Sequence, residues 1–193
     1  MSAIPEYPRR HAVTAEEYLR MGEAGIFHPE ARLELIEGDI VERANIGPAH
    51  GSVLMALNAH FGRAVGERAL VAVQSSLTLS RRSIPQPDLV LLEPRADRYF
   101  RALPSPSDVL LLVEVCDTTL PFDRGVKAPL YGRAGIRETW IIDIPGRSLT
   151  VFRDPDGNGY ATSFTVSGSE RVSVLALPET TLAPEALFPS DPA

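Results

Sequence analysis

The segment Val109-Leu110-Leu111-Leu112-Val113-Glu114-Val115 is an almost unbroken run of branched apolar residues. Such a run predicts a β-strand covered on both faces, as at the centre of a layered α/β protein. Only Glu114 interrupts it. A carboxylate in a buried strand is costly unless it meets a cation or strong hydrogen-bond donors. Glu114 is therefore one partner of a salt bridge, a strand-end residue that reaches water, or a metal ligand.

A second apolar run, Leu89-Val90-Leu91-Leu92, begins directly after Asp88. Because Asp88 follows Pro87, a turn that leads into this strand is enough to explain it on its own. If the two strands are neighbours, however, Asp88 and Glu114 can lie near corresponding ends and share one hard cation. Ligation by oxygen alone suits Mg²⁺ or Mn²⁺ rather than Zn²⁺. Such an ion lowers the pKa of a bound water and neutralises charge on a phosphoryl oxygen.

Lys127 is the single lysine among 19 lysine and arginine residues. A chain with this bias uses arginine wherever a generic cation suffices, so a lysine that remains can be needed as a compact point charge. Lys127 lies in a helix predicted from about Phe122 to Ala134, after the Glu114 strand. From there its ammonium group can orient an attacking water or stabilise developing negative charge. The alternative is a helical ion pair with Asp123, four residues earlier.

The rest of the chain alternates short helices and strands without a repeat or an internal boundary. We therefore predict one domain over residues 1–193, with a folded part over 12–188 and loose termini at 1–11 and 189–193. Thr14 and Glu17 predict a capping box at a helix start. The other predicted elements are a hairpin over 33–41 that turns at Glu37-Gly38, a helix over 51–68, an alternating strand over 71–79, and strands over 140–144, 149–153 and 160–166.

Composition narrows the class of protein. With 193 residues, 44% of them hydrophobic, the chain can bury a proper core. No apolar run approaches the length of a membrane span, no basic-then-apolar segment follows Met1, and the single cysteine excludes an intramolecular disulfide. We therefore expect a soluble protein of a reducing cytoplasm. The net charge of −6 argues weakly against nucleic acid as a partner, because charge can be polarised over a surface.

The order of these motifs resembles the Uma-type restriction endonuclease family of the PD-(D/E)XK nuclease superfamily. The resemblance covers about residues 12–188. It rests on Arg32-Leu33-Glu34-Leu35-Ile36-Glu37-Gly38, His50, Gln86-Pro87-Asp88-Leu89-Val90-Leu91, Leu112-Val113-Glu114-Val115, Asp123-Arg124-Gly125-Val126-Lys127 with Tyr131, and Ala134-Gly135-Ile136-Arg137-Glu138-Thr139-Trp140-Ile141-Ile142-Asp143. It implies an α/β fold with a central mixed β-sheet flanked by helices, and β-hairpin extensions at the amino and carboxy ends.

The same resemblance implies a metal centre. Asp88 and Glu114 are its implied ligands, and the carbonyl of Val115 is a further one. The sequence departs from the superfamily motif at Cys116, which stands where the motif places its lysine. The resemblance implies that Lys127 reaches the site from the helix instead. Cys116 itself is expected to be a small buried residue, because no histidine follows it to activate a thiol.

Three further residues are candidates for the same site. Glu34 matches an upstream acidic position of the family and is either a contact of the metal or its water, or an exposed hairpin residue. His50 stands at a helix start, where it either caps the helix or contacts the substrate or a ligand carboxylate. Gln74, on the polar side of its predicted strand, can face the site.

These residues predict a Mg²⁺-dependent endonuclease, with Mn²⁺ as a substitute, that hydrolyses phosphodiester bonds of DNA. The alternative is a catalytically inactive protein that keeps the nuclease fold and binds nucleic acid or another partner. A hydrolase for small phosphoesters is a third possibility, favoured by a closed pocket. A homodimer is expected for an enzyme that cuts both strands of a duplex, because two-fold symmetry matches the duplex.

Overall fold

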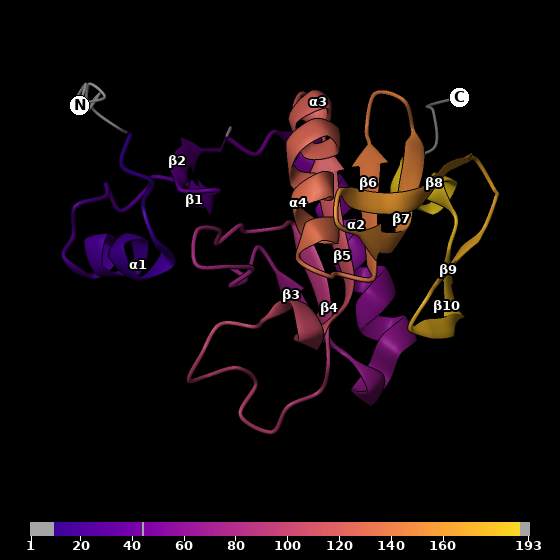
Figure 1. Ribbon diagram of the computed structural model, residues 1–193. Helices are drawn as coiled ribbons and strands as arrows, with labels where there is room; N and C mark the ends of the chain where they lie inside the picture. The colour runs from indigo at the N-terminus through magenta and orange to yellow at the C-terminus, as the bar shows by residue number, and fades with distance from the viewer. Residues whose placement is uncertain (1–9, 44, 190–193) are drawn as a thin grey trace, which may run out of the picture.

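A six-stranded β-sheet forms the centre of the computed structural model, which describes residues 10–43 and 45–189 (Figure 1). The strand order is β3-β4-β5-β6-β7-β8. Neighbours are antiparallel except for β5 and β6, which are parallel. The strands are β3 (Leu70–Val73), β4 (Leu89–Leu92), β5 (Val109–Cys116), β6 (Glu138–Asp143), β7 (Ser148–Asp156) and β8 (Gly159–Ser167). The expected mixed sheet flanked by helices is therefore confirmed.

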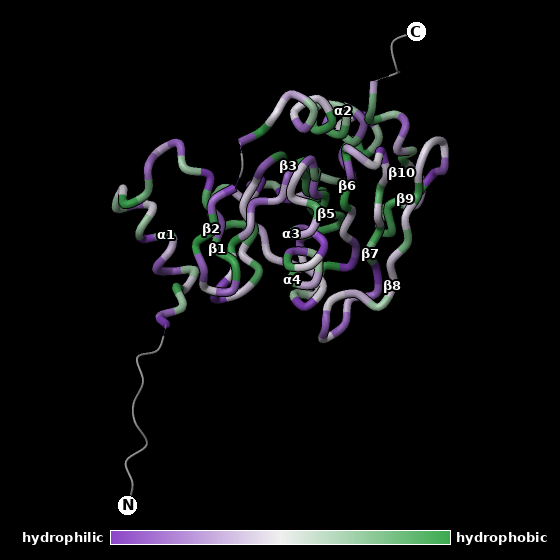
Figure 2. The backbone as a smooth tube through the Cα atoms, turned by 90° about the horizontal axis from the view of Figure 1, so that it is seen from above, coloured by the Kyte–Doolittle hydropathy of each residue, from purple (hydrophilic) through white to green (hydrophobic). Residues whose placement is uncertain are grey.

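Helices cover the sheet on both faces, with α2 on one side and α3 and α4 on the other (Figure 2). Helix α2 (Pro48–Val65) packs its apolar stripe on the face that carries Leu111 and Trp140. The opposite face carries Leu112 and is covered by α4 (Ala128–Arg133), which buries Tyr131. Because both faces are covered, β4 is apolar throughout and β5 is apolar except for Glu114, as their sequences predict.

Two small hairpins, one toward each end of the chain as expected, form two-stranded sheets separate from the central one. The first pairs β1 (Leu33–Ile36) with β2 (Asp39–Glu42), and the second pairs β9 (Val172–Val174) with β10 (Leu177–Leu182). Helix α1 (Ala15–Glu23) precedes the first hairpin and has the predicted capping box. Short 3₁₀ turns, η1 (Gly66–Arg68), η2 (Pro106–Asp108) and η4 (Pro184–Leu187), complete the elements.

The connection from β5 to β6 is helical but not uniform. It consists of α3 (Leu120–Phe122), a π-helical turn η3 (Asp123–Lys127) and α4. Pro129 has no N–H to donate, so the preceding turn cannot continue as an ordinary α-helix without loss. The π turn accommodates this: the N–H of Ala128 donates to the carbonyl of Asp123, five residues earlier. The predicted helix over 122–134 is present, with this irregularity at the level of Lys127.

The predicted strand over 71–79 is only half right. Strand β3 ends at Val73, and Gln74 adopts a left-handed backbone with a φ of 48°. Leu77 and Leu79 are nevertheless buried, packed on the face that carries Leu112. The alternation in the sequence therefore records burial of a loop against the sheet rather than strand pairing.

The predicted loose termini fall largely outside the described residues, namely residues 1–9 and 190–193. Within the described part, Arg10 contacts Asp39 of β2. None of the helices in residues 10–43 and 45–189 is long and apolar enough to cross a membrane.

Candidate metal centre

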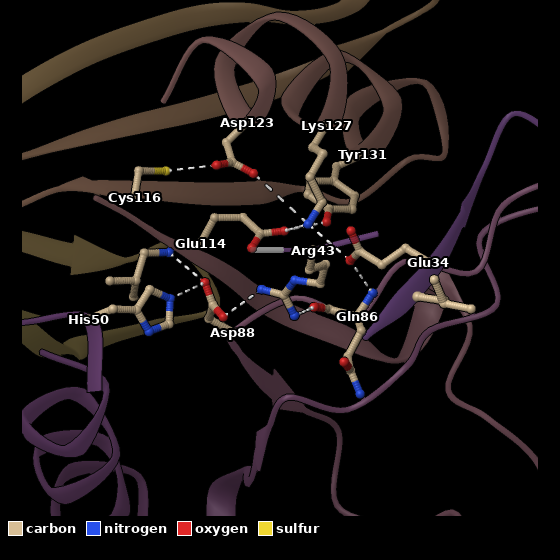
Figure 3. A network of polar contacts seen from close by, with 12 residues as sticks. Glu34, Arg43, His50, Gln86, Asp88, Glu114, Cys116, Asp123, Lys127 and Tyr131 are labelled. Atoms are coloured by element: carbon tan, nitrogen blue, oxygen red, sulfur yellow. Dashed lines mark hydrogen bonds and ion pairs between the residues drawn. The ribbon is translucent and has the colours of Figure 1, made fainter. Parts of the chain in front are cut away.

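Asp88 and Glu114 meet at one end of the sheet, although they are 26 residues apart in the sequence (Figure 3). Leu89 of β4 is paired with Val113 of β5, so the antiparallel register places Asp88 opposite Glu114. The N–H of Val115 donates to Asp88 Oδ2 at 2.9 Å. Both acidic side chains are buried. The two residues lie at corresponding strand ends, as the sequence predicts.

Lys127 extends from the helical segment into this cluster (Figure 3). Its Nζ lies 2.7 Å from Glu114 Oε1 and 3.1 Å from Glu34 Oε1, and its side chain is 2% exposed. The distance to Asp123 Oδ1 is 3.9 Å. The helical ion pair is therefore the longest of the three contacts. Lys127 is directed at the candidate centre and does not face solvent.

Glu34 is the second contact of Lys127 and comes from the amino-terminal hairpin. It is 1% exposed, which rules out an exposed hairpin residue. Its Oε1 also accepts a hydrogen bond from the N–H of Gln86 at 2.6 Å. Glu34 thus ties β1 to the segment that leads into Asp88.

His50 and Arg43 contact the carboxylate of Asp88. His50 Nε2 lies 3.2 Å from Asp88 Oδ2, and Arg43 Nη2 lies 2.7 Å from Asp88 Oδ1. His50 stands in the first turn of α2 but makes no side-chain cap, so of its predicted roles the contact with a ligand carboxylate is the one present. Within the described residues, His50 Nδ1 is buried without a hydrogen-bond partner.

Two more side chains hold the cluster in place. The hydroxyl of Tyr131, on α4, donates to Glu114 Oε1 at 2.5 Å. The thiol of Cys116 donates to Asp123 Oδ2 at 3.1 Å. Burial and the nearby charge of Asp123 raise the pKa of the Cys116 thiol, so this cysteine is the small buried residue expected and not a nucleophile.

The electrostatics of the site follow from burial and charge. Burial opposes ionisation of Asp88, but the hydrogen bond from His50 and the charge of Arg43 outweigh it and lower the pKa of this carboxyl. Burial raises the pKa of Glu114 to about 8, with Lys127 opposing this shift. Burial alone would lower the pKa of Lys127, but Glu114 and Glu34 outweigh it and raise that pKa. Lys127 is therefore a permanent ammonium ion.

The cluster brings buried carboxylates and cations together. Ion pairs link four buried carboxylates, Glu34, Asp88, Glu114 and Asp123, to Lys127 and Arg43. Arg32 also lines the cleft, and the charges of Asp88 and Glu34 act on it. Carboxylates and cations therefore alternate around the strand ends.

The donor types at the strand ends fit a hard divalent cation. Asp88 and Glu114 offer carboxylate oxygens. The N–H of Val115 points toward Asp88, and the carbonyl of a strand residue projects to the same side as its N–H, so a carbonyl oxygen faces the same space. Oxygen donors of this kind suit Mg²⁺ and Mn²⁺. Among the residues described, no group of three or more histidine, cysteine, aspartate or glutamate side chains is already arranged as a metal cage. The fit therefore rests on two carboxylates and a carbonyl.

A cleft of about 460 Å³ opens over this cluster. Its floor includes Asp88, Glu114 and Lys127, and its walls come from the β2–α2 and β5–α3 connections. Phe122, on the wall, is 38% exposed. Gln74 is not among the lining residues, although its N–H donates to the carbonyl of Asp88. Of the predicted site residues, Gln74 alone is therefore placed beside the site without facing it.

Arg43 is a residue of the site that the sequence does not predict. It directly follows β2, and its guanidinium reaches both Asp88 and the carbonyl of Gln86. Because the chain uses arginine for nearly every cation, nothing marks this arginine among the 18. Its hairpin position next to the matched motif at Arg32–Gly38 is the only signal that could have suggested it.

The mixed sheet, its two covering layers and the acidic cluster at the strand ends define an α/β protein of the nuclease fold class. A family profile, Uma2, described as "Putative restriction endonuclease", matches residues 15–185. The chain belongs to this family.

A solved structure supports the same fold. It is described as a putative nuclease belonging to DUF820 from Anabaena variabilis, and it superposes with a TM-score of 0.71 at 17% sequence identity. The match covers 91% of this chain and 97% of that chain. At this identity the likeness shows the fold alone. None of the curated proteins compared with the chain matches it.

Proposed function

We propose that this protein is a metal-dependent endonuclease that hydrolyses phosphodiester bonds of DNA with Mg²⁺, or Mn²⁺ in its place. One observation carries the proposal: the ammonium of Lys127 is buried against Glu114 and Glu34, beside Asp88, on the floor of an open cleft. Family membership agrees with a nuclease. A purely structural ion pair would not need a cleft above it.

Asp88 and Glu114, with the Val115 carbonyl, are the residues that would hold the ion. When bound, the ion supplies an acidified water and charge neutralisation at the phosphate. His50 and Tyr131 orient the two carboxylates through the hydrogen bonds described above. Such outer partners fix the direction in which ligand lone pairs point.

Lys127 acts through its charge. Because Glu114 and Glu34 raise its pKa, the ammonium favours its protonated form. It instead stabilises the negative charge that develops on the phosphate oxygens and donates hydrogen bonds to the attacking water. Glu34 is, with Glu114, the second carboxylate that holds the ammonium in place.

The test is cleavage of single-stranded, duplex and branched DNA in Mg²⁺ and in Mn²⁺, compared with EDTA. Asp88→Asn and Lys127→Met should each abolish metal-dependent cleavage while circular dichroism shows a native fold. Asp97→Asn is the matched control, because this half-buried acid lies outside the cluster and pairs with Arg95 beyond the far end of β4. Undiminished cleavage by either site variant would refute the assignment.

The same experiment separates the two alternatives. Metal-independent DNA binding without cleavage of any substrate would identify a binding protein that keeps the nuclease fold. Hydrolysis of a small phosphodiester such as bis(p-nitrophenyl) phosphate, with no DNA cleavage, would identify a small-molecule hydrolase, and the cleft volume is within the range of such sites.

We further propose a homodimer as the active form on duplex DNA. Each chain offers one candidate centre, so cutting both strands in one binding event needs two copies related by the two-fold symmetry of the duplex. Light scattering of the purified protein, alone and with a duplex, measures this directly. A monomer that cuts both strands in one encounter would contradict it.

A further inference from the structure

Arg43 is a cation that contacts the same carboxylate proposed to bind the ion. Its Nη2 lies 2.7 Å from Asp88 Oδ1 and its Nη1 lies 2.6 Å from the carbonyl of Gln86. The side chain is only 13% exposed, yet it lines the cleft. Arg43 is thus held at the candidate centre and also faces the space where a substrate would lie.

This contact conflicts with a divalent ion on Asp88. Asp88 Oδ2 already accepts from the N–H of Val115 and faces His50, so Oδ1 is the oxygen that Arg43 takes. Two like charges a few ångströms apart repel strongly in a partly buried site. Either the ion binds weakly, or the guanidinium moves away when it binds.

The structure allows the guanidinium to move without a change of fold. Arg43 is anchored by its backbone at the end of β2, where its N–H donates to the carbonyl of Arg32 at 2.7 Å. The long side chain can change rotamer above that anchor, and the cleft gives it room. A guanidinium released into this cleft presents a planar fork of donors, which matches a phosphate oxygen pair.

We propose that Arg43 exchanges partners: it neutralises Asp88 in the metal-free protein and binds a non-bridging phosphate oxygen of the nucleic acid once the ion is bound. This inference rests on the proposed function, and it adds a substrate ligand from the amino-terminal hairpin. Ion binding and phosphate binding should then favour each other. Ion binding releases Arg43 from Asp88, and phosphate binding keeps Arg43 away from Asp88.

The test compares Arg43→Gln with the wild type in two binding measurements without turnover. Mn²⁺ binding to the metal-free protein is measured by titration calorimetry. Binding of a labelled DNA duplex is measured by fluorescence anisotropy in Ca²⁺. We expect Arg43→Gln to bind Mn²⁺ about tenfold more tightly, because a competing positive charge is removed. We expect it to bind DNA about tenfold more weakly, because a charge-assisted phosphate contact is lost.

Opposite signs of the two effects are the diagnostic feature, since a merely structural residue would weaken both. Arg95→Gln removes the same charge from the loop after β4 and should leave both affinities unchanged. If Arg43→Gln does not fold, Arg43→Lys decides: it keeps the charge but loses the fork, so DNA affinity should fall while Mn²⁺ affinity stays.

The outcomes separate this inference from the proposed function. If the wild type binds Mn²⁺ and cleaves DNA but Arg43→Gln binds Mn²⁺ no more tightly, the partner exchange is wrong and the nuclease assignment stands. Unchanged DNA affinity in Arg43→Gln, or in Arg43→Lys where that variant decides, also overturns it. If the wild type neither binds Mn²⁺ nor cleaves any substrate, both proposals fall.

Discussion

Replacing Lys127 by methionine tests whether the ammonium is the electrostatic centre of the cluster. Methionine keeps most of the length and apolar volume of the lysine, so the main change is the loss of the charge. The structure places that charge 2.7 Å from Glu114 and 3.1 Å from Glu34, with all three side chains buried. The variant therefore leaves two buried carboxylates without their cation.

The expected loss of stability follows from those contacts. Removing one partner of a buried ion pair costs about 3–5 kcal/mol. Because Glu114 can take up a proton when its cation is lost, we expect the lower end, about 3 kcal/mol. For a chain of this size that corresponds to a fall of about 6–12 °C in Tm. Urea unfolding in EDTA, followed by circular dichroism, measures the free energy of unfolding.

A double-mutant cycle with Glu114→Gln assigns the loss to the pair. The glutamine removes the orphaned charge and can still accept the hydrogen bond of Tyr131. Lys127→Met/Glu114→Gln should therefore recover at least about half of the stability that Lys127→Met loses. If Lys127→Met costs less than about 1 kcal/mol, or if the double variant is no more stable than the single one, the buried pair described here is not what holds the cluster together.

Other buried polar groups have measurable consequences of their own. Glu138 is fully buried and accepts from Trp140 and the amide of Leu175, so Glu138→Ala should destabilise the fold by about 3 kcal/mol in urea unfolding, with the exposed Glu93→Ala as control. His50→Ala should weaken Mn²⁺ binding about tenfold or more in titration calorimetry, because an outer partner of Asp88 is lost, while Tm changes little. Cys116 should not react with a thiol reagent in the native protein and should react fully after denaturation, because the thiol is buried and its pKa is raised.

Each of these three predictions has an outcome that would contradict it. Wild-type stability of Glu138→Ala would mean that this carboxylate does not connect β6 to the carboxy-terminal hairpin. Equal Mn²⁺ affinity in His50→Ala would mean that the contact with Asp88 is incidental. Rapid labelling of Cys116 in the native state would mean that the helical segment above it opens easily.

The sequence predicts best those strands that are covered on both faces of the sheet, because nearly every side chain in such a strand is apolar. Strand β5 was readable because every residue but Glu114 is apolar, and this needs both faces covered. The alternation over 71–79 has the same appearance as a strand, but Gln74 leaves the ladder and the apolar side chains are buried by a loop. Periodicity reports which side chains are buried, and it does not report which backbone groups are paired.

The candidate site was readable in part for a similar reason. Lys127 is conspicuous because it is the single lysine of the chain, and Glu114 because its neighbours in the sequence are apolar. Arg43 has neither signal, since its role depends on the amino-terminal hairpin lying beside the segment that leads into β4. The burial of Glu34 has the same origin: long-range contacts with Lys127 and Gln86 decide it, and no local pattern encodes such contacts.

The position of the lysine has a physical consequence for the site. Side chains two apart on a strand share a face, so a lysine at position 116 would reach the cluster from the same strand as Glu114. This chain places Cys116 there and brings its ammonium from a π turn of the helical segment 120–133 instead. The ammonium is therefore held by the packing of that segment on the sheet and not by strand geometry. Pro129 and the π turn before it fix the rotation of the helix, and thereby the direction of Lys127, so the geometry of the centre depends on the layer that covers the sheet as much as on the sheet itself.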